Sequence, residues 1–188
     1  GEVVDLEMNR YNKKVAASRI SEVTSKFIET YKDADTAVLV WGGDNLSGSI
    51  HPDLAITNDG LDAVCMMDCL ESFRHKIKLL RTRFNKVRIV GVYGNHSRLT
   101  PKPWAKASHQ VNWDWLMYCL LEREFLEDNG VEFHIANSPD VQVTINGFNF
   151  LVTHGDYFPG GGGGKLPAKV MRMREAVDAQ TSNKVDYL

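Results

Sequence analysis

Blocks of hydrophobic and polar positions follow one another along the chain and predict helices and strands in turn. Apolar residues at helical spacing predict amphipathic helices over 15–31, 61–83 and 113–125, and a basic helix over 167–179. Short apolar runs predict strands over 36–41, 87–93, 131–135, 141–145 and 148–153. The first two are continuous runs, which favours strands covered on both faces. This alternation predicts an α/β fold.

Local signals add detail to this prediction. Asn146-Gly147 is typical of a two-residue hairpin turn between the last two strands. The HPDL segment at 51–54 favours the start of a helix, and 184–188 favours the opening of one more strand. The long loop after 96 contains two prolines and is expected to lack regular structure. The glycine run 160–164 is expected to form a mobile loop over the functional site, whose candidate residues follow.

Three of the predicted strands end in similar polar motifs, which we call the strand-end motifs. The first is Trp41-Gly42-Gly43-Asp44, the second is Tyr93-Gly94-Asn95-His96, and the third is Thr153-His154-Gly155-Asp156. In open α/β sheets the chemistry lies beyond the strand ends at one edge. We therefore expect the three motifs to meet in one site.

The side chains in these motifs suit a metal centre. Asp44 offers an anionic oxygen able to bridge two cations, Asn95 a neutral carbonyl oxygen, and His154 an imidazole nitrogen. A mixed oxygen and nitrogen set favours Mn, Fe or Zn over Mg or Ca. Asp156 either orients His154 or only caps the loop. His96 is expected to lie beside the metals as a proton donor.

Composition limits the class of protein. The 188 residues, with 43% hydrophobic and 24% charged content, predict one domain over 1–188. No apolar run approaches the ~20 residues that span a bilayer, and the first residues lack the apolar block of a signal peptide. Three cysteines without a paired spacing favour free thiols and a cytoplasmic location.

Charge is distributed unevenly along the chain. Residues 72–113 contain no Asp or Glu but ten Lys and Arg residues, although the net charge of the chain is only −2. Because this segment includes the second strand-end motif, its field favours an anionic substrate. Arg98 is expected to pair with a phosphate oxygen. Trp104, between Lys102 and Lys106, either stacks on single-stranded bases or packs on the domain edge.

The segments GGDNLSG, YGNHSR and THGD resemble, in that order, the second, third and fourth sequence blocks of the calcineurin-like metallophosphoesterases. The resemblance implies a two-sheet β-sandwich flanked by helices, an αββα fold. It also implies a pair of divalent metal ions, with Mn favoured over Fe or Zn. By the same resemblance, Asp44 is the bridging ligand, Asn95 and His154 are metal ligands, and His96 is the catalytic histidine.

The sequence departs from the family pattern at three points. The first block, Asp-x-His, and the last, Gly-His-x-His, are missing and are expected just outside the termini. Ser97 stands where an Asp or Glu usually supports the catalytic histidine. The YGNHSR, GSIHPDL and NWDW segments resemble metallophosphoesterases of bacteriophage type. His51, within the second of these, is read as an ordinary loop residue, with a substrate-facing role as the alternative.

The expected function is hydrolysis of a nucleic-acid or nucleotide phosphodiester by metal-bound hydroxide, with DNA or RNA as the anionic partner and no membrane. Two alternatives stay open. One is a catalytically impaired scaffold of the same fold that binds nucleic acid or a protein partner. The other is a protein or small-molecule phosphatase, which shares the chemistry and differs in the pocket.

Overall fold

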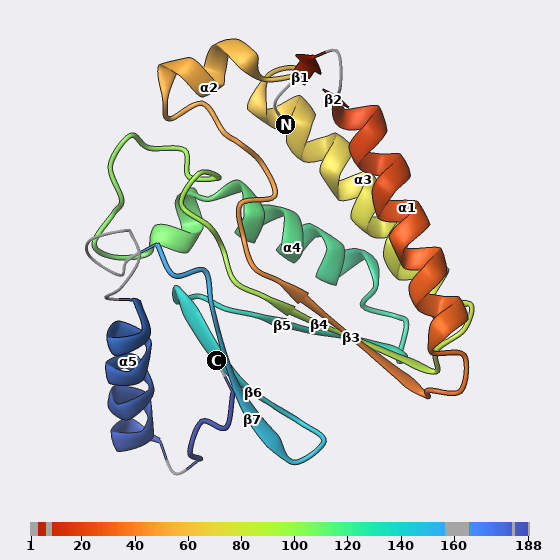
Figure 1. Ribbon diagram of the computed structural model, residues 1–188, viewed down its shortest axis with the longest axis vertical. Coiled ribbons are helices and arrows are strands. Elements are labelled where there is room, and N and C mark those ends of the chain that lie inside the picture. The colour runs from red at the N-terminus through yellow and green to blue at the C-terminus, as the bar shows by residue number, and fades with distance from the viewer. Residues whose placement is uncertain (1–3, 7–8, 157–165, 182, 188) are drawn as a thin grey trace.

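The computed structural model describes residues 4–6, 9–156, 166–181 and 183–187 (Figure 1). The elements in chain order are β1 (Val4–Leu6), β2 (Asn9–Tyr11), α1 (Lys13–Thr30), β3 (Thr36–Trp41), α2 (Pro52–Thr57), α3 (Asp62–Arg81), β4 (Lys86–Gly91), a 3₁₀ helix η1 (Ser108–Val111), α4 (Trp113–Glu124), β5 (Val131–Ile135), β6 (Asp140–Ile145), β7 (Phe148–Thr153) and α5 (Leu166–Gln180).

Most predicted elements are confirmed. The bounds of β3, β5 and β7 are those predicted, and the other predicted helices and strands differ by a few residues at their ends. The β1–β2 hairpin was not predicted, because three-residue strands show no periodicity. The expectation that the loop after His96 lacks regular structure was wrong at its end, where η1 forms beyond both prolines.

The molecule is mixed α/β, and its larger sheet is parallel. The strand order is β3-β4-β5, with Trp41 paired to Gly91 and Gly91 to Ile135. Helix α3 connects the first pair and α4 the second, as parallel strands require a crossover. The first two strand-end motifs therefore leave neighbouring strands at the same edge.

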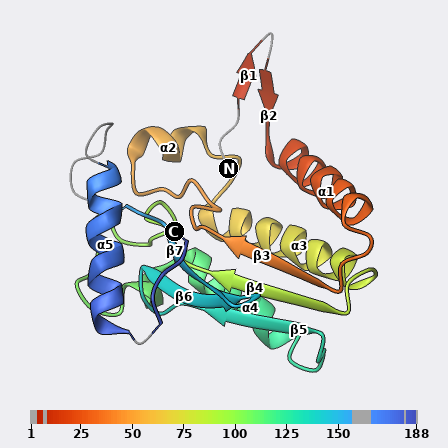
Figure 2. The ribbon, with the colours of Figure 1, turned by 60° about the horizontal axis from the view of Figure 1, so that its bottom comes forward.

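The main core lies between this sheet and the helices α3 and α4 (Figures 1 and 2). Ile77 of α3, Ile89 of β4 and Leu121 of α4 are fully buried in it. Helix α1 packs against α3 on the outside of this layer (Figure 2). The regular apolar stripe of α3 thus fixes where β3 and β4 end relative to the helices.

Strands β1 and β2 form one two-stranded antiparallel sheet, and the hairpin β6–β7 forms another. Asn146 and Gly147 both have positive φ, at 51° and 83°, as the predicted hairpin turn requires. The hairpin faces the side of β4 opposite to the helices. There Arg88 donates to the Thr144 carbonyl at 3.2 Å, and Val90, on the same face of the strand, is buried. This contact carries the third strand-end motif toward the other two.

The sequence predicts that β3 and β4 are each buried on both faces. This is true only of β4. In β4, Ile89 and Val90 point to opposite faces and both are buried. In β3, however, Val40 is 53% exposed. The expectation was wrong for β3, which lies at the edge of the sheet, whereas the contact of Arg88 with the hairpin is on β4.

The C-terminal segment runs beside the hairpin. Tyr187 forms a single parallel bridge with Phe150, and Leu151 N–H donates to the Tyr187 carbonyl at 2.8 Å, in the segment predicted as a strand. The glycine run 160–164, expected to form a mobile loop, lies outside the described residues. None of the helices that the structure describes has both the length and the apolar character needed to cross a membrane.

Candidate metal centre

The first two strand-end motifs are in van der Waals contact because two of their residues are glycines. Gly43 has a φ of 84°, and a Cβ at this position would overlap the backbone of Gly94. A Cβ on Gly94 would in turn overlap the Asp44 carboxylate and its backbone nitrogen. The backbone of Asp44 lies in the left-handed region, with a φ of 54°. Asp tolerates this conformation better than most residues do. Any larger side chain at 43 or 94 would push the Asp44 carboxylate away from the second motif.

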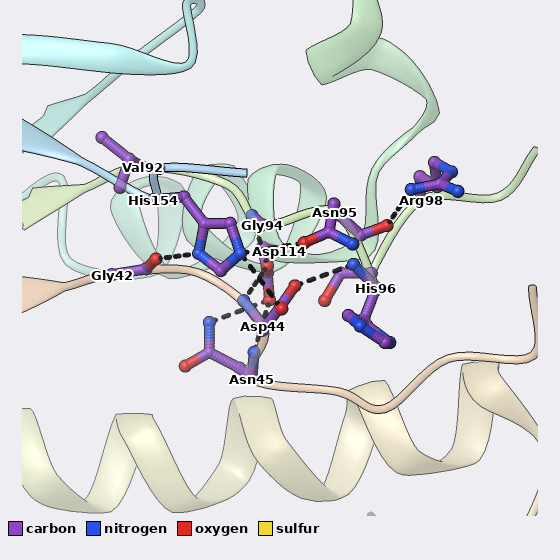
Figure 3. Close-up of polar contacts among 12 residues, drawn as sticks. Gly42, Asp44, Asn45, Val92, Gly94, Asn95, His96, Arg98, Asp114 and His154 are labelled. Atoms are coloured by element: carbon purple, nitrogen blue, oxygen red, sulfur yellow. Dashed lines mark hydrogen bonds and ion pairs between the residues drawn. The ribbon is translucent and has the colours of Figure 1, made fainter. Parts of the chain in front are cut away.

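Asp114, in the first turn of α4, joins both motifs through its buried carboxylate. It accepts hydrogen bonds from the backbone N–H of Asp44 at 2.9 Å, of Gly94 at 3.0 Å and of Asn45 at 3.2 Å, and from the Asn45 side chain at 2.8 Å. The Asp114 side chain has no solvent exposure. Its four donors come from both loops, so their relative position is set by this one group (Figure 3).

The N-terminus of α4 supports this arrangement. Asn112 is the N-cap residue, and its side-chain oxygen accepts from Asp114 N–H at 2.9 Å. Its amide nitrogen donates to the Gly94 carbonyl at 2.8 Å. Burial raises the pKa of Asp114, while hydrogen bonds from Asn45, the Gly94 amide and Ser97 oppose that rise. The position at a helix N-terminus also favours the charged carboxylate.

The three predicted ligands meet at one point (Figure 3). His154 Nε2 lies 3.1 Å from Asp44 Oδ2 and 3.1 Å from Asn95 Oδ1. The other ring nitrogen, Nδ1, lies 2.6 Å from the Gly42 carbonyl of the first motif. The main chain at Gly42 thus orients the imidazole so that Nε2 faces the two oxygens. This is the orientation that metal-binding histidines commonly receive from a partner on their second nitrogen.

The donor set fits a transition-metal ion. Atoms bound to one ion at about 2.1–2.2 Å and at right angles to each other lie about 3.0 Å apart. Both distances from Nε2 agree with that spacing. The set contains one carboxylate oxygen, one amide oxygen and one imidazole nitrogen, which suits Mn, Fe or Zn. The residues present are therefore compatible with one ion, held on three sides by Asp44, Asn95 and His154.

The close approach of His154 and Asp44 shifts the pKa of both side chains. The hydrogen bond to Asp44 raises the pKa of His154 to about 9 against the effect of partial burial, and the contact with the Gly42 carbonyl adds to the rise. Partial burial raises the pKa of Asp44, but hydrogen bonds from His154 and the His96 amide outweigh it, so that this pKa is lowered. The two residues thus form an imidazolium–carboxylate pair.

His96 lies on the other side of Asp44 from His154 (Figure 3). Its backbone N–H donates to Asp44 Oδ1 at 2.8 Å. The imidazole ring of His96 is not part of the cluster formed by Asp44, Asn95 and His154. The ring of His51, the residue before α2, has its centroid 5.5 Å from that of His96. His51 was read as an ordinary loop residue, and the structure brings it beside the predicted catalytic histidine.

Arg98, which is predicted to pair with a phosphate oxygen, contacts backbone carbonyls in the structure. Its guanidinium donates to the carbonyls of Asn95 at 2.8 Å, Thr100 at 2.9 Å and Pro101 at 3.0 Å. These bonds brace the loop after the second motif and engage the side chain with the backbone. In this conformation Arg98 positions the loop, and the phosphate contact expected from the sequence stays a prediction.

Ser97 has no solvent exposure, and its position explains why a serine stands here. Its hydroxyl lies 3.5 Å from the Leu46 carbonyl and lowers the pKa of Asp114 by a side-chain hydrogen bond. A carboxylate at position 97 would be buried next to Asp114, and two buried carboxylates repel each other. The carboxylate that supports the loops of Asp44 and Asn95 is therefore that of Asp114, in α4.

Three arginines of the positive segment are held in ion pairs. Arg74 pairs with Glu71 and Glu124, Arg81 with Asp128, and Arg88 with Glu132. These pairs offset part of the positive charge on α3 and β4. Lys102 and Lys106 lie in the loop after the second motif, as Arg98 does, and are exposed.

Comparisons of the chain with protein-family models, curated proteins and solved structures find no match. Within the described residues, no group of three or more His, Cys, Asp and Glu side chains is placed to hold a metal ion. The third predicted ligand beside Asp44 and His154 is the amide oxygen of Asn95, which is not one of these residue types. The site thus rests on the geometry of the three motifs themselves.

The sequence pattern does not indicate that Asp114 and Asn112 belong to this site. The NWDW segment that contains them enters the prediction only through the bacteriophage-type resemblance. The available signal was a polar residue, Asn112, at an N-cap and an acid two positions later. That pattern marks any helix start, and nothing local reveals that Asp114 binds Asp44, 70 residues away.

We expect replacement of Asp114 to destabilise the protein strongly. Asp114→Ala leaves four donors without a buried acceptor, which should lower the free energy of unfolding by at least about 3 kcal/mol. Asp53→Ala, at an exposed first-turn position of α2, is the matched control and should cost less than about 1 kcal/mol. Urea unfolding followed by circular dichroism measures both. Equal, small losses would contradict the role of Asp114.

We expect Gly94→Ala to weaken metal binding, because the new methyl group displaces Asp44. The affinity for Mn²⁺, measured by isothermal titration calorimetry, should fall about 10- to 100-fold. Gly42→Ala is the control, since no atom lies within 4 Å of a Cβ at that position and its carbonyl is retained. Unchanged Mn²⁺ affinity in Gly94→Ala would show that the contact between the motifs does not matter.

The His154–Asp44 pair makes stability depend on pH in metal-free protein. Because the pKa of His154 rises from 6.5 to about 9 on folding, the stabilisation is complete below pH 6.5 and is lost as pH rises through 9. NMR titration of the ring with chelator present should give the raised pKa. In urea unfolding from pH 6 to 9.5, the difference between the wild type and His154→Ala should shrink with rising pH. A constant difference would exclude the pair.

Proposed function

We propose that this protein is a metal-dependent phosphoesterase of the calcineurin-like metallophosphoesterase family, acting on a nucleic-acid or nucleotide phosphodiester. The observation that carries the proposal is the convergence of Asp44, Asn95 and His154 from three separate strand ends, with Nε2 of His154 3.1 Å from both oxygens. The same three motifs carry the family resemblance, in the same order along the chain.

The architecture supports the family assignment. Helices α3 and α4 cover one face of the parallel sheet, and the β6–β7 hairpin faces the other side of β4. We propose that this arrangement is part of the two-sheet αββα sandwich of the family. In that fold the second sheet would begin with β6, β7 and the segment that bridges to Phe150.

In the proposed centre, Asp44, Asn95 and His154 would hold the ion, with Mn favoured by the mixed donor set. A bound divalent ion would supply Lewis-acid stabilisation of the phosphoryl oxygens and would acidify a water molecule. Oδ2 of Asp44 faces His154, whereas Oδ1 accepts from the His96 amide. The two oxygens thus point to different sides, which suits the bridging role that the resemblance implies.

His96 is the proposed proton donor to the departing oxygen. Departure of an alkoxide in neutral water requires a proton, and an imidazole within hydrogen-bond reach supplies it efficiently. The His96 backbone is fixed by its bond to Asp44, while the ring lies clear of the ligands (Figure 3). We propose that His51, next to this ring, faces the substrate rather than solvent alone.

Three variants test the proposal on Mn²⁺-loaded protein with bis(p-nitrophenyl) phosphate and single-stranded DNA as substrates. His154→Ala should lose bound Mn²⁺, measured by elemental analysis, together with hydrolysis. His96→Ala should keep its Mn²⁺ and lose at least about 100-fold in rate. His134→Ala, at an exposed position on β5, is the matched control and should change neither quantity.

Other outcomes point elsewhere. Failure of the wild type to bind Mn²⁺, Fe²⁺ or Zn²⁺ would remove the proposed centre. Metal binding without hydrolysis of any phosphoester would indicate the non-catalytic scaffold. Faster hydrolysis of p-nitrophenyl phosphate than of the diester would identify a phosphatase of the same chemistry.

A further inference from the structure

A cavity of about 260 Å³ adjoins the candidate metal centre. Asn95, one of the three ligands, lines it together with the backbone of Gly94. Most of its remaining wall is apolar or aromatic, and is contributed by Tyr93, Pro103, Trp104, Val111 and Pro139. A group attached to a phosphate held at the proposed metal centre would therefore have this cavity as its neighbour.

The wall of the cavity is held in place by polar contacts. Arg98 bonds to three carbonyls of the loop, and Leu99 N–H donates to the Val111 carbonyl at 2.8 Å. The Tyr93 hydroxyl lies 2.8 Å from the Ser108 hydroxyl. Ala107 has a φ of 54°, which costs on the order of 1 kcal/mol for a residue with a Cβ and is maintained by the surrounding contacts. The cavity is thus formed before any ligand binds.

Trp104 is the unusual part of this wall. Its side chain is 51% exposed, although the loop around it is braced and an indole buries well. Lys102 and Lys106 lie on either side of it in the sequence and are exposed. An exposed aromatic face between cations beside a phosphate site matches what single-stranded nucleic acid offers, namely flat bases on an anionic backbone.

We propose that this cavity binds an unpaired nucleobase of single-stranded nucleic acid, stacked on Trp104, next to the phosphodiester held at the metal centre. The inference rests on the proposed function and names the substrate that it selects. Proline and tyrosine side chains give the other flat surfaces. Asp156 on the rim provides an acceptor for an amino or imino group on the edge of the base. Paired bases are excluded because their faces are covered by the neighbouring bases of the stack.

The test compares two strands of equal length and charge. A fluorescein-labelled thymidine oligonucleotide and an abasic strand of the same length are titrated with the whole protein, in low salt with chelator, and fluorescence anisotropy is recorded. The wild type should bind the thymidine strand more tightly. Trp104→Ala should weaken that binding about tenfold and leave the abasic strand unchanged. Trp104→Phe, which retains an aromatic face, should restore most of the affinity.

Leu126→Ala is the matched control, because Leu126 is 72% exposed and lines a different pocket, with Lys86 and Gly130. It should bind both strands as the wild type does. Equal affinity of the wild type for the two strands, or an equal loss on both in Trp104→Ala, would overturn the proposal. Trp104-dependent binding without hydrolysis would retain the base pocket and reject the phosphoesterase. Hydrolysis of bis(p-nitrophenyl) phosphate without a Trp104 effect on binding would support the phosphoesterase and reject the base pocket.

Discussion

The buried carboxylate of Asp114 is the interaction on which the candidate site depends. Removing a carboxylate from water is costly, and here the cost is offset by four hydrogen-bond donors and by the N-terminus of α4. Those donors belong to the loops that carry Asp44 and Asn95, so one group satisfies two turns that would otherwise leave buried N–H groups unpaired. The apolar packing of α4 on the sheet places this carboxylate, and the carboxylate places the ligands.

The main features of the fold could be predicted from hydrophobic pattern because most elements bury one regular face. The stripe of α3 and the continuous run of β4 are signals of that kind, and Asn146-Gly147 defined its turn by local sterics alone. Coverage of the sheet could not be predicted in the same way. Val40 has the same apolar character as Val90, and only the position of β3 at the edge leaves it exposed.

The meeting of the strand-end motifs follows from topology, whereas the contacts of Arg98 follow from the folding of a loop. The motifs of Asp44 and Asn95 had to meet because parallel neighbours end at one edge. The approach of His154 requires in addition that the hairpin pack on β4, a contact that the strand pattern alone does not specify. The role of Arg98 was not predictable, since its three carbonyl partners become available only when the chain from 95 to 101 has turned back on itself.

The contact between His154 and Asn95 joins residues 59 positions apart, in segments that follow strands of separate sheets. Any ion shared by these side chains and Asp44 would act as a removable cross-link between the β3–β4–β5 sheet and the hairpin. Closing such long loops restricts the unfolded chain far more than the folded one. Occupancy of the site and docking of the hairpin would then be thermodynamically coupled, and depletion of metal would loosen the two sheets from each other before either sheet unfolds.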